Sequence, residues 1–163
     1  MKKFIVLSIV LLMLAGFAIT SSAQPITVTL FADQTLPVGT LTVEVVGTDL
    51  VVTYDIDDPW ELGETHLYVG DSVPAKSAPG RFPYGPDDAV DGVYIIPLAD
   101  LDAEVGDILV IAAHAEVTNP DEIDPVTELP PREETAWADV TQIRPGKNWA
   151  TYFTFVVPAV VAP

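Results

Sequence analysis

The chain has no cysteine, so no disulfide can stabilise the fold, and stability must come from a buried core or from bound metal. Positive charge is also scarce, since 7 Lys and Arg stand against 24 Asp and Glu in 163 residues. A chain this acidic repels nucleic acid and anionic lipid. We therefore predict no nucleic-acid binding. We expect the excess of acidic residues to serve binding of cations, binding of basic partners or simply solubility.

Familiar catalytic motifs are missing as well. The sequence has no Ser, His and Asp set at a nucleophile elbow, no glycine-rich phosphate loop and no Rossmann turn. Among 24 acids some pair always has the spacing of a glycosidase, so that pattern carries no information. The sequence therefore favours a non-enzymatic protein.

The first residues have the three parts of a secretory signal. Met1 to Lys3 is basic, Phe4 to Ile19 is apolar, and Thr20 to Ala23 supplies the small residues of a cleavage site. The alternative, a membrane anchor, needs about 20 apolar residues, and this run is shorter. We predict a signal peptide over residues 1–23, one secreted or cell-surface domain over residues 24–163, and no integral membrane span after cleavage.

The most apolar run of the remaining chain covers residues 108–117. One row of alternate residues is wholly apolar: Leu109, Ile111, Ala113, Ala115 and Val117. The other row turns polar at its far end, with His114 and Glu116. A strand that is apolar on both sides for most of its length belongs in the middle of a sheet, with cover above and below.

Alternation elsewhere predicts further short strands. They cover residues 26–31, 38–46, 50–56, 64–70, 93–97, 134–140 and 148–157. The second and third of these are joined by a tight connection containing Gly, which predicts an antiparallel hairpin. About eight strands, no long helix and turns rich in Gly, Pro and Asp indicate an all-β fold. We predict a two-layer antiparallel β-sandwich of immunoglobulin-like or jelly-roll type.

Two long segments between these strands have no periodicity of their own. Residues 71–92 and residues 118–133 each carry four prolines. A loop of more than about 15 residues is uncommon in a compact domain unless it is functional or disordered. The first of these loops is therefore a place to expect function.

Five phrases in this chain resemble a β-sandwich module of secreted microbial proteins whose role is unassigned. They are Glu64–Gly70 (ETHLYVG), Pro79–Tyr84 (PGRFPY), Ile111–Ala115 (IAAHA), Glu134–Ala138 (ETAWA) and Asn148–Phe153 (NWATYF). The resemblance covers most of residues 24–163. It implies a secreted or surface β-domain and brings no catalytic mechanism.

Both histidines of the chain lie two residues from a glutamate. A spacing of two puts Glu64 with His66, and His114 with Glu116, on one face of each strand. If the strands are neighbours, the four side chains converge in a site suited to zinc or another transition metal, and an open position permits hydrolysis by metal-activated water. The alternative is that each histidine is a buried, hydrogen-bonded residue of the strand.

Acidic residues gather in three connections. They are Asp55, Asp57, Asp58 and Glu61; Asp87, Asp88 and Asp91; and Asp100, Asp102, Glu104 and Asp107. Calcium takes about six to eight oxygen ligands from bent loops of this kind. The first cluster is the best candidate for a calcium site, because Pro59 and Gly63 stiffen its turn. The alternative is that these acidic residues are simply dispersed over the surface and exposed to solvent.

Aromatic residues offer a third kind of site. Trp60, Phe82 and Tyr84, with Arg81 next to Phe82, are candidate ligand-binding residues, because rings in sugar-binding sandwiches stack on sugar faces. The alternative is that aromatic residues on the predicted strands, such as Tyr68, Trp137 and Trp149, belong to the hydrophobic core.

We therefore expect a non-enzymatic, exported domain for binding, adhesion or assembly, with calcium as a possible stabiliser. Its partner would be a surface protein, a glycan or copies of itself. A metal-dependent hydrolase and a carbohydrate-binding module are the alternatives.

Overall fold

A computed structural model describes residues 24–123, 126, 131–138 and 141–159. The described part consists of nine strands and three short 3-10 helices. The strands are β1 (Ile26–Ala32), β2 (Leu36–Val46), β3 (Asp49–Ile56), β4 (Glu61–Gly70), β5 (Val93–Pro97), β6 (Ile108–Asn119), β7 (Arg132–Ala138), β8 (Thr141–Gln142) and β9 (Thr151–Val156). The 3-10 helices are η1 (Pro79–Arg81), η2 (Pro86–Asp88) and η3 (Leu98–Leu101). Within these residues, none of the helices has the length and apolar character needed to cross a membrane.

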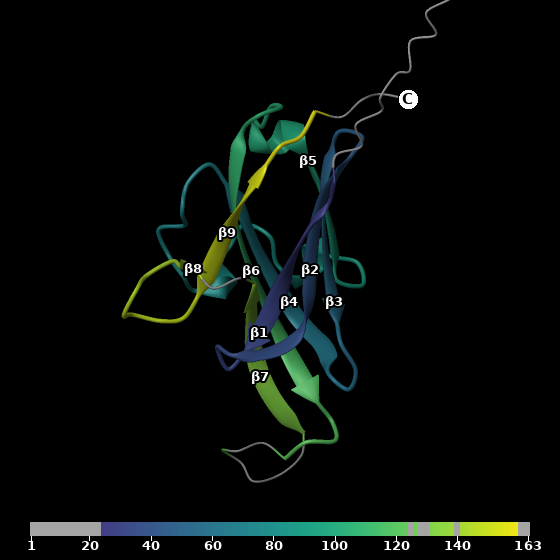
Figure 1. Cartoon of the computed structure of the whole chain (residues 1–163), viewed down its shortest axis with the longest axis vertical. Coiled ribbons are helices and arrows are strands. Elements are labelled where there is room, and N and C mark those ends of the chain that lie inside the picture. The colour runs from purple at the N-terminus through teal and green to yellow at the C-terminus, as the bar shows by residue number, and fades with distance from the viewer. Residues whose placement is uncertain (1–23, 124–125, 127–130, 139–140, 160–163) are drawn as a thin grey trace, which may run out of the picture.

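All strand pairs are antiparallel, and the sheet folds over into two layers. The strand order is β5-β3-β2-β1-β7-β6-β9-β8, and β4 pairs with β6 outside this path. One short strand pairing joins the two layers, between Leu30–Ala32 of β1 and Ala136–Ala138 of β7. Figure 1 shows β2 and β3 on one side of the molecule and β6 and β9 on the other. The predicted all-β sandwich is confirmed.

The main core lies between the layers and draws on both. Leu41, Val43 and Val52 come from one layer, while Leu67 and Ile111 come from the other, and all five are fully buried. β2 and β3 form the predicted antiparallel hairpin, and its register places Val43 opposite Val52. Strand alternation therefore places one apolar row of each strand in the same interior.

Strand β6 is the central strand of its layer, as the sequence predicts. It pairs with β4 along one edge, and with β9 and then β7 along the other. Residues 109–115 are all buried, which means that both faces of the strand are covered. The row from Leu109 to Val117 faces the main core, and the other row faces a second, smaller cluster.

The C-terminal strands differ in extent from the prediction. β7 begins two residues earlier, at Arg132, and residues 139–140 of the predicted strand lie outside the described residues. The last strand covers 151–156 rather than 148–157, because Asn148 belongs to the preceding loop and donates a hydrogen bond to Ser77 Oγ at 2.5 Å.

Candidate functional site

The face of the β4–β6–β7 layer that points away from the main core carries most of the candidate residues. We call this the outer face and define it by His66 and Tyr68 of β4, His114 and Glu116 of β6, and Trp137 of β7. These side chains share a face because His66 is opposite His114 in the register, and His114 is opposite Trp137. Part of this face is covered by the second, smaller hydrophobic cluster, which is rich in aromatic residues and is called the second aromatic cluster below.

The second aromatic cluster is assembled from distant parts of the chain. Its buried members are Ala112, Trp137, Ile143 and Ala150, with Tyr68, Phe82, Trp149 and Tyr152 packed against them. The Trp137 ring is the centre, because its centroid lies 6.0 Å from that of Phe82, 6.4 Å from that of Trp149 and 5.0 Å from that of His114. Tyr68 and Trp149 are therefore partly buried packing residues, and Phe82 holds the long loop on the sheet.

The two histidines lie side by side at the edge of this cluster. Their ring centroids are 5.7 Å apart and the rings are tilted by 51°. His114 is buried, with 4% of its surface exposed, and His66 is half-buried. Both Nδ1 atoms are buried and have no hydrogen-bond partner in the described structure. Two unsatisfied ring nitrogens on neighbouring imidazoles are unusual, because buried polar atoms are nearly always paired.

Burial controls the charge of His114. Desolvation by burial, and then repulsion from the positive charge of His66, lower the pKa of His114 from 6.5 to about 4. The His114 imidazole is therefore neutral at physiological pH and keeps a lone pair free for a proton or a metal ion.

Neither glutamate of the proposed metal site is gathered with the histidines into a group of ligands. Among the described residues, no three His, Cys, Asp or Glu side chains come close enough together to hold a metal ion. The register between β4 and β6 shifts between Leu62 and Thr65, so Gly63 and Glu64 together lie opposite Glu116. Strict alternation fails across such a bulge, and the spacing of two does not fix the face of Glu64.

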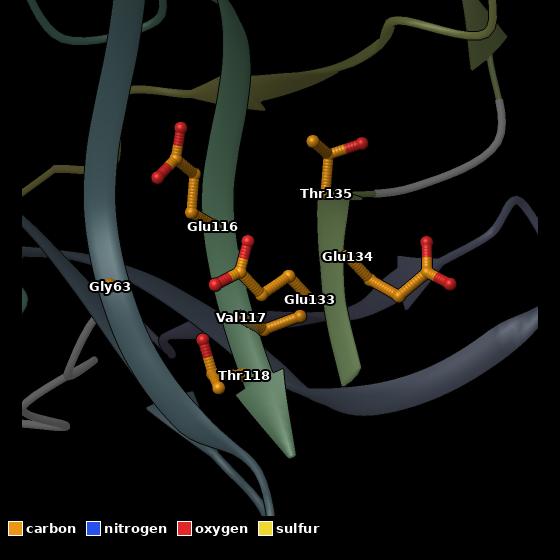
Figure 2. Close-up of a pocket in the computed structure, with 7 residues that line it drawn as sticks. All are labelled: Gly63, Glu116, Val117, Thr118, Glu133, Glu134 and Thr135. Atoms are coloured by element: carbon orange, nitrogen blue, oxygen red, sulfur yellow. The ribbon is translucent and has the colours of Figure 1, made fainter. Parts of the chain in front are cut away.

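Glu116 instead lines an open acidic groove of about 390 Å³ beside the histidines. Figure 2 shows the lining residues on β4, β6 and β7, with the Glu133 side chain reaching over β6 and Glu134 pointing the other way. Arg132 forms an ion pair with Glu134 at 3.0 Å, so that carboxylate is already neutralised. Local sequence patterns did not single out Glu133, whose place opposite Thr118 in this groove follows only from the pairing of β6 with β7.

The predicted calcium cluster lies in the connection from β3 to β4. Asp55 is an exposed residue of β3, Asp57 and Asp58 form the turn, and Glu61 begins β4. The turn is held by its backbone, because the Asp57 amide donates to the Val38 carbonyl at 3.0 Å. These carboxylates form no group of three suited to an ion in the part of the chain described, so calcium binding stays a prediction.

The candidate aromatic residues do not form one site. Trp60 is buried in the main core, and the Arg132 guanidinium lies 5.6 Å from its ring centroid. Trp60 immediately precedes the first residue of β4, whereas Phe82 contacts Tyr68 near the last residue of that strand. The two rings therefore lie at opposite ends of β4. Arg81 is exposed on the loop beside Phe82.

The loop of residues 71–92 is built onto the free edge of β4. The Leu67 amide donates to the Tyr84 carbonyl at 2.9 Å, and the Tyr84 amide donates back at 3.2 Å. Between this loop and β4 lies an open pocket of about 390 Å³, which we call the loop pocket. Its lining includes Tyr68, Ser72, Lys76, Arg81, Phe82 and Pro83.

Three of the five cations beyond residue 23 line the loop pocket or contact its loop. Beyond residue 23 the sequence has five cations, and Lys76 and Arg81 line this pocket. Arg144 donates a hydrogen bond to the Ala75 carbonyl of the same loop, and Lys147 lies in the turn that Arg144 begins. Lys76 was missed by the sequence argument, although the scarcity of cations was a signal that could have identified it.

Replacing Tyr94 with phenylalanine should detach the far end of this loop and cost about 1 to 2 kcal/mol of unfolding free energy. The fully buried Tyr94 hydroxyl donates to the Gly85 carbonyl at 3.2 Å and lies 2.8 Å from the hydroxyl of buried Thr65. The variant therefore leaves the Thr65 hydroxyl without this partner and the Gly85 carbonyl with only the Asp88 amide. Urea unfolding measures the loss. Tyr68→Phe is the matched control, because its exposed bond to Ser72 can be replaced by water, and an equal loss in both variants would contradict the expectation.

Comparisons of the chain with protein-family models, curated proteins and solved structures found no match. The geometry of the outer face and its loop therefore carries the functional proposal.

Proposed function

We propose that this protein is an exported, non-enzymatic β-sandwich domain that binds an acidic glycan at the cell surface or in the extracellular space. The observation that carries the proposal is the loop pocket, which combines aromatic rings with two of the few cations in a strongly acidic chain. The signal-like residues 1–23 and the resemblance to secreted modules support the exported location.

The chemistry of the loop pocket suits a sugar that carries a carboxylate or sulfate group. The rings of Tyr68 and Phe82, 6.0 Å apart and tilted by 54°, provide an apolar wall on which a sugar face can stack. Arg81 supplies a fork of donors that matches a carboxylate or sulfate, and Lys76 adds a second positive charge. Acidic residues over the rest of the surface disfavour anions elsewhere, which restricts such a ligand to this pocket.

Replacing Lys76 or Arg81 with serine should weaken binding of an acidic glycan about tenfold each, because each variant removes one charge-assisted contact. An array of neutral, carboxylated and sulfated glycans identifies the ligand, and titration with the strongest hit measures the change. Binding should also weaken as salt is added, since the contact is partly electrostatic.

Lys147→Ser is the matched control for Lys76→Ser, because it removes the same charge from a residue outside the loop pocket. Equal weakening by the two variants would show a general charge effect and sink the proposed site. Deleting residues 71–92 is less informative, because the deletion would also uncover Trp137. Capture of a surface protein with no glycan bound would reassign the domain to protein recognition.

Self-assembly is the second candidate within the same class, favoured by one observation. β5 ends the strand order and exposes Ile95, so one edge of the sheet is open to another strand. Light scattering with and without calcium tests assembly directly. No contact on the described residues favours the metal-dependent hydrolase.

A further inference from the structure

The two histidines of the chain, His66 and His114, lie together on the outer face, and their geometry is independent of the proposed glycan binding. The chain has only two, 48 positions apart, and the fold places them opposite each other on adjacent strands. Their Nδ1 atoms are buried and unpaired within the described structure, and His114 is almost fully enclosed. A merely structural histidine would satisfy this nitrogen with a backbone or carboxylate partner, so a missing ligand is the physical alternative.

The distance between the rings fits one ion bound by both imidazoles. Metal–imidazole bonds are about 2 Å long, so two nitrogens on one ion lie up to about 4 Å apart, with each ring centre just behind its nitrogen. The two ring centroids then lie at most slightly more than about 6 Å apart, and the observed separation of 5.7 Å is within that limit.

The surroundings select an ion of low charge and low coordination number. No third His, Cys, Asp or Glu joins the pair among the described residues, and Zn²⁺ or Ca²⁺ would have to complete its shell with water inside an aromatic cluster. The desolvation free energy of an ion rises with the square of its charge, so a monovalent ion costs about a quarter as much to bury as a divalent one.

We propose that His66 and His114 form a two-coordinate site for a monovalent d10 metal ion, with Cu⁺ as the natural ligand. Cu⁺ accepts two imidazole nitrogens in a near-linear arrangement and needs no water. Residues 24–163 have no cysteine or methionine, so these imidazoles are the only side chains of that region with the softness this ion requires. Half-buried His66 is the more exposed of the two rings and forms the entrance to the site.

Titration of the purified protein with Ag⁺, a redox-inert probe of the same charge and geometry, tests the proposal. We expect one equivalent to bind, and Cu⁺ to bind with the same stoichiometry under anaerobic conditions against a coloured Cu⁺ chelator. His66→Phe and His114→Phe should each weaken binding at least about a hundredfold, because one imidazole alone holds the ion poorly. Tyr68→Phe, on the same face, should bind as the unchanged protein does.

Three results would overturn the proposal. They are no uptake of Ag⁺ by the folded protein, undiminished binding in the double histidine variant, and tighter binding of Zn²⁺ than of Cu⁺ through the same residues. Circular dichroism verifies that the variants fold. If either variant is unfolded, the ¹⁵N chemical shifts of the unchanged protein decide the matter, because Ag⁺ must shift Nδ1 of both rings, and unshifted signals would reject the site.

Discussion

Replacing Trp137 with alanine should lower the free energy of unfolding by about 3 to 5 kcal/mol, the cost of emptying a buried indole site. The loss is large because Trp137 is 5% exposed and touches the rings of Phe82, His114 and Trp149. These partners come from two loops and one strand, so no single neighbour can move in to fill the space. Urea unfolding followed by circular dichroism measures the effect.

The same variant should also release the loop of residues 71–92, because Phe82 loses its main anchor. Trypsin reports this directly, since Lys76 and Arg81 are its cleavage sites in the loop. We expect faster cleavage at these positions under conditions where the sandwich stays folded. Ile95→Ala is the control, because Ile95 is exposed on β5, and it should change stability by no more than about 0.5 kcal/mol. An effect of Trp137→Ala no larger than this would mean that the cluster does not hold the outer face together.

The metal-free protein should lose about 3 kcal/mol of stability through His114 as the pH falls from 6.5 to 4. Burial, and then the charge of His66, lower the pKa of His114 to about 4 in the folded protein, while in the unfolded chain it returns to 6.5. Between these values the unfolded chain binds more protons, so acid favours unfolding. The contribution is fully present above pH 6.5 and is lost as the pH falls toward 4.

His114→Phe separates this effect from the titration of the many carboxylates, which both proteins share. The difference in unfolding free energy between the two proteins should change by about 3 kcal/mol between pH 7.5 and 4, and most of that change should occur below pH 6. Urea unfolding at closely spaced pH values, with a chelator present, gives the measurement. The charges that face His114 are His66 across the strand pair and Glu116 on its own strand. Identical pH profiles for the two proteins would show that His114 is already protonated or solvated in the fold.

The candidate site was only partly predictable. A spacing of two correctly suggested that His114 and Glu116 share a face, because β6 is regular there. The same rule did not settle the face of Glu64, because a bulge at Gly63 breaks the alternation of β4. The sequence also did not show which strands are neighbours. It could therefore predict that His66 approaches His114 only if their two strands pair.

The loop pocket illustrates the same limit. The length and proline content of residues 71–92 marked the loop as a place to expect function. Its position against Tyr68 depends on pairing between Leu67 and Tyr84 and on the contact of Phe82 with Trp137, both between residues far apart in the chain. No local pattern encodes such contacts.

Local patterns in the chain specified the all-β class, the position of nearly every strand and the burial of β6. The row from Leu109 to Val117 needs only the alternation of side chains to be recognised. The meeting of the two histidines, the aromatic cover over the outer face and the gathering of cations around one pocket depend on strand order, register and one bulge. Those features arise from long-range packing. The residues that contribute to each contact lie far apart in the sequence, so no local pattern contains them together.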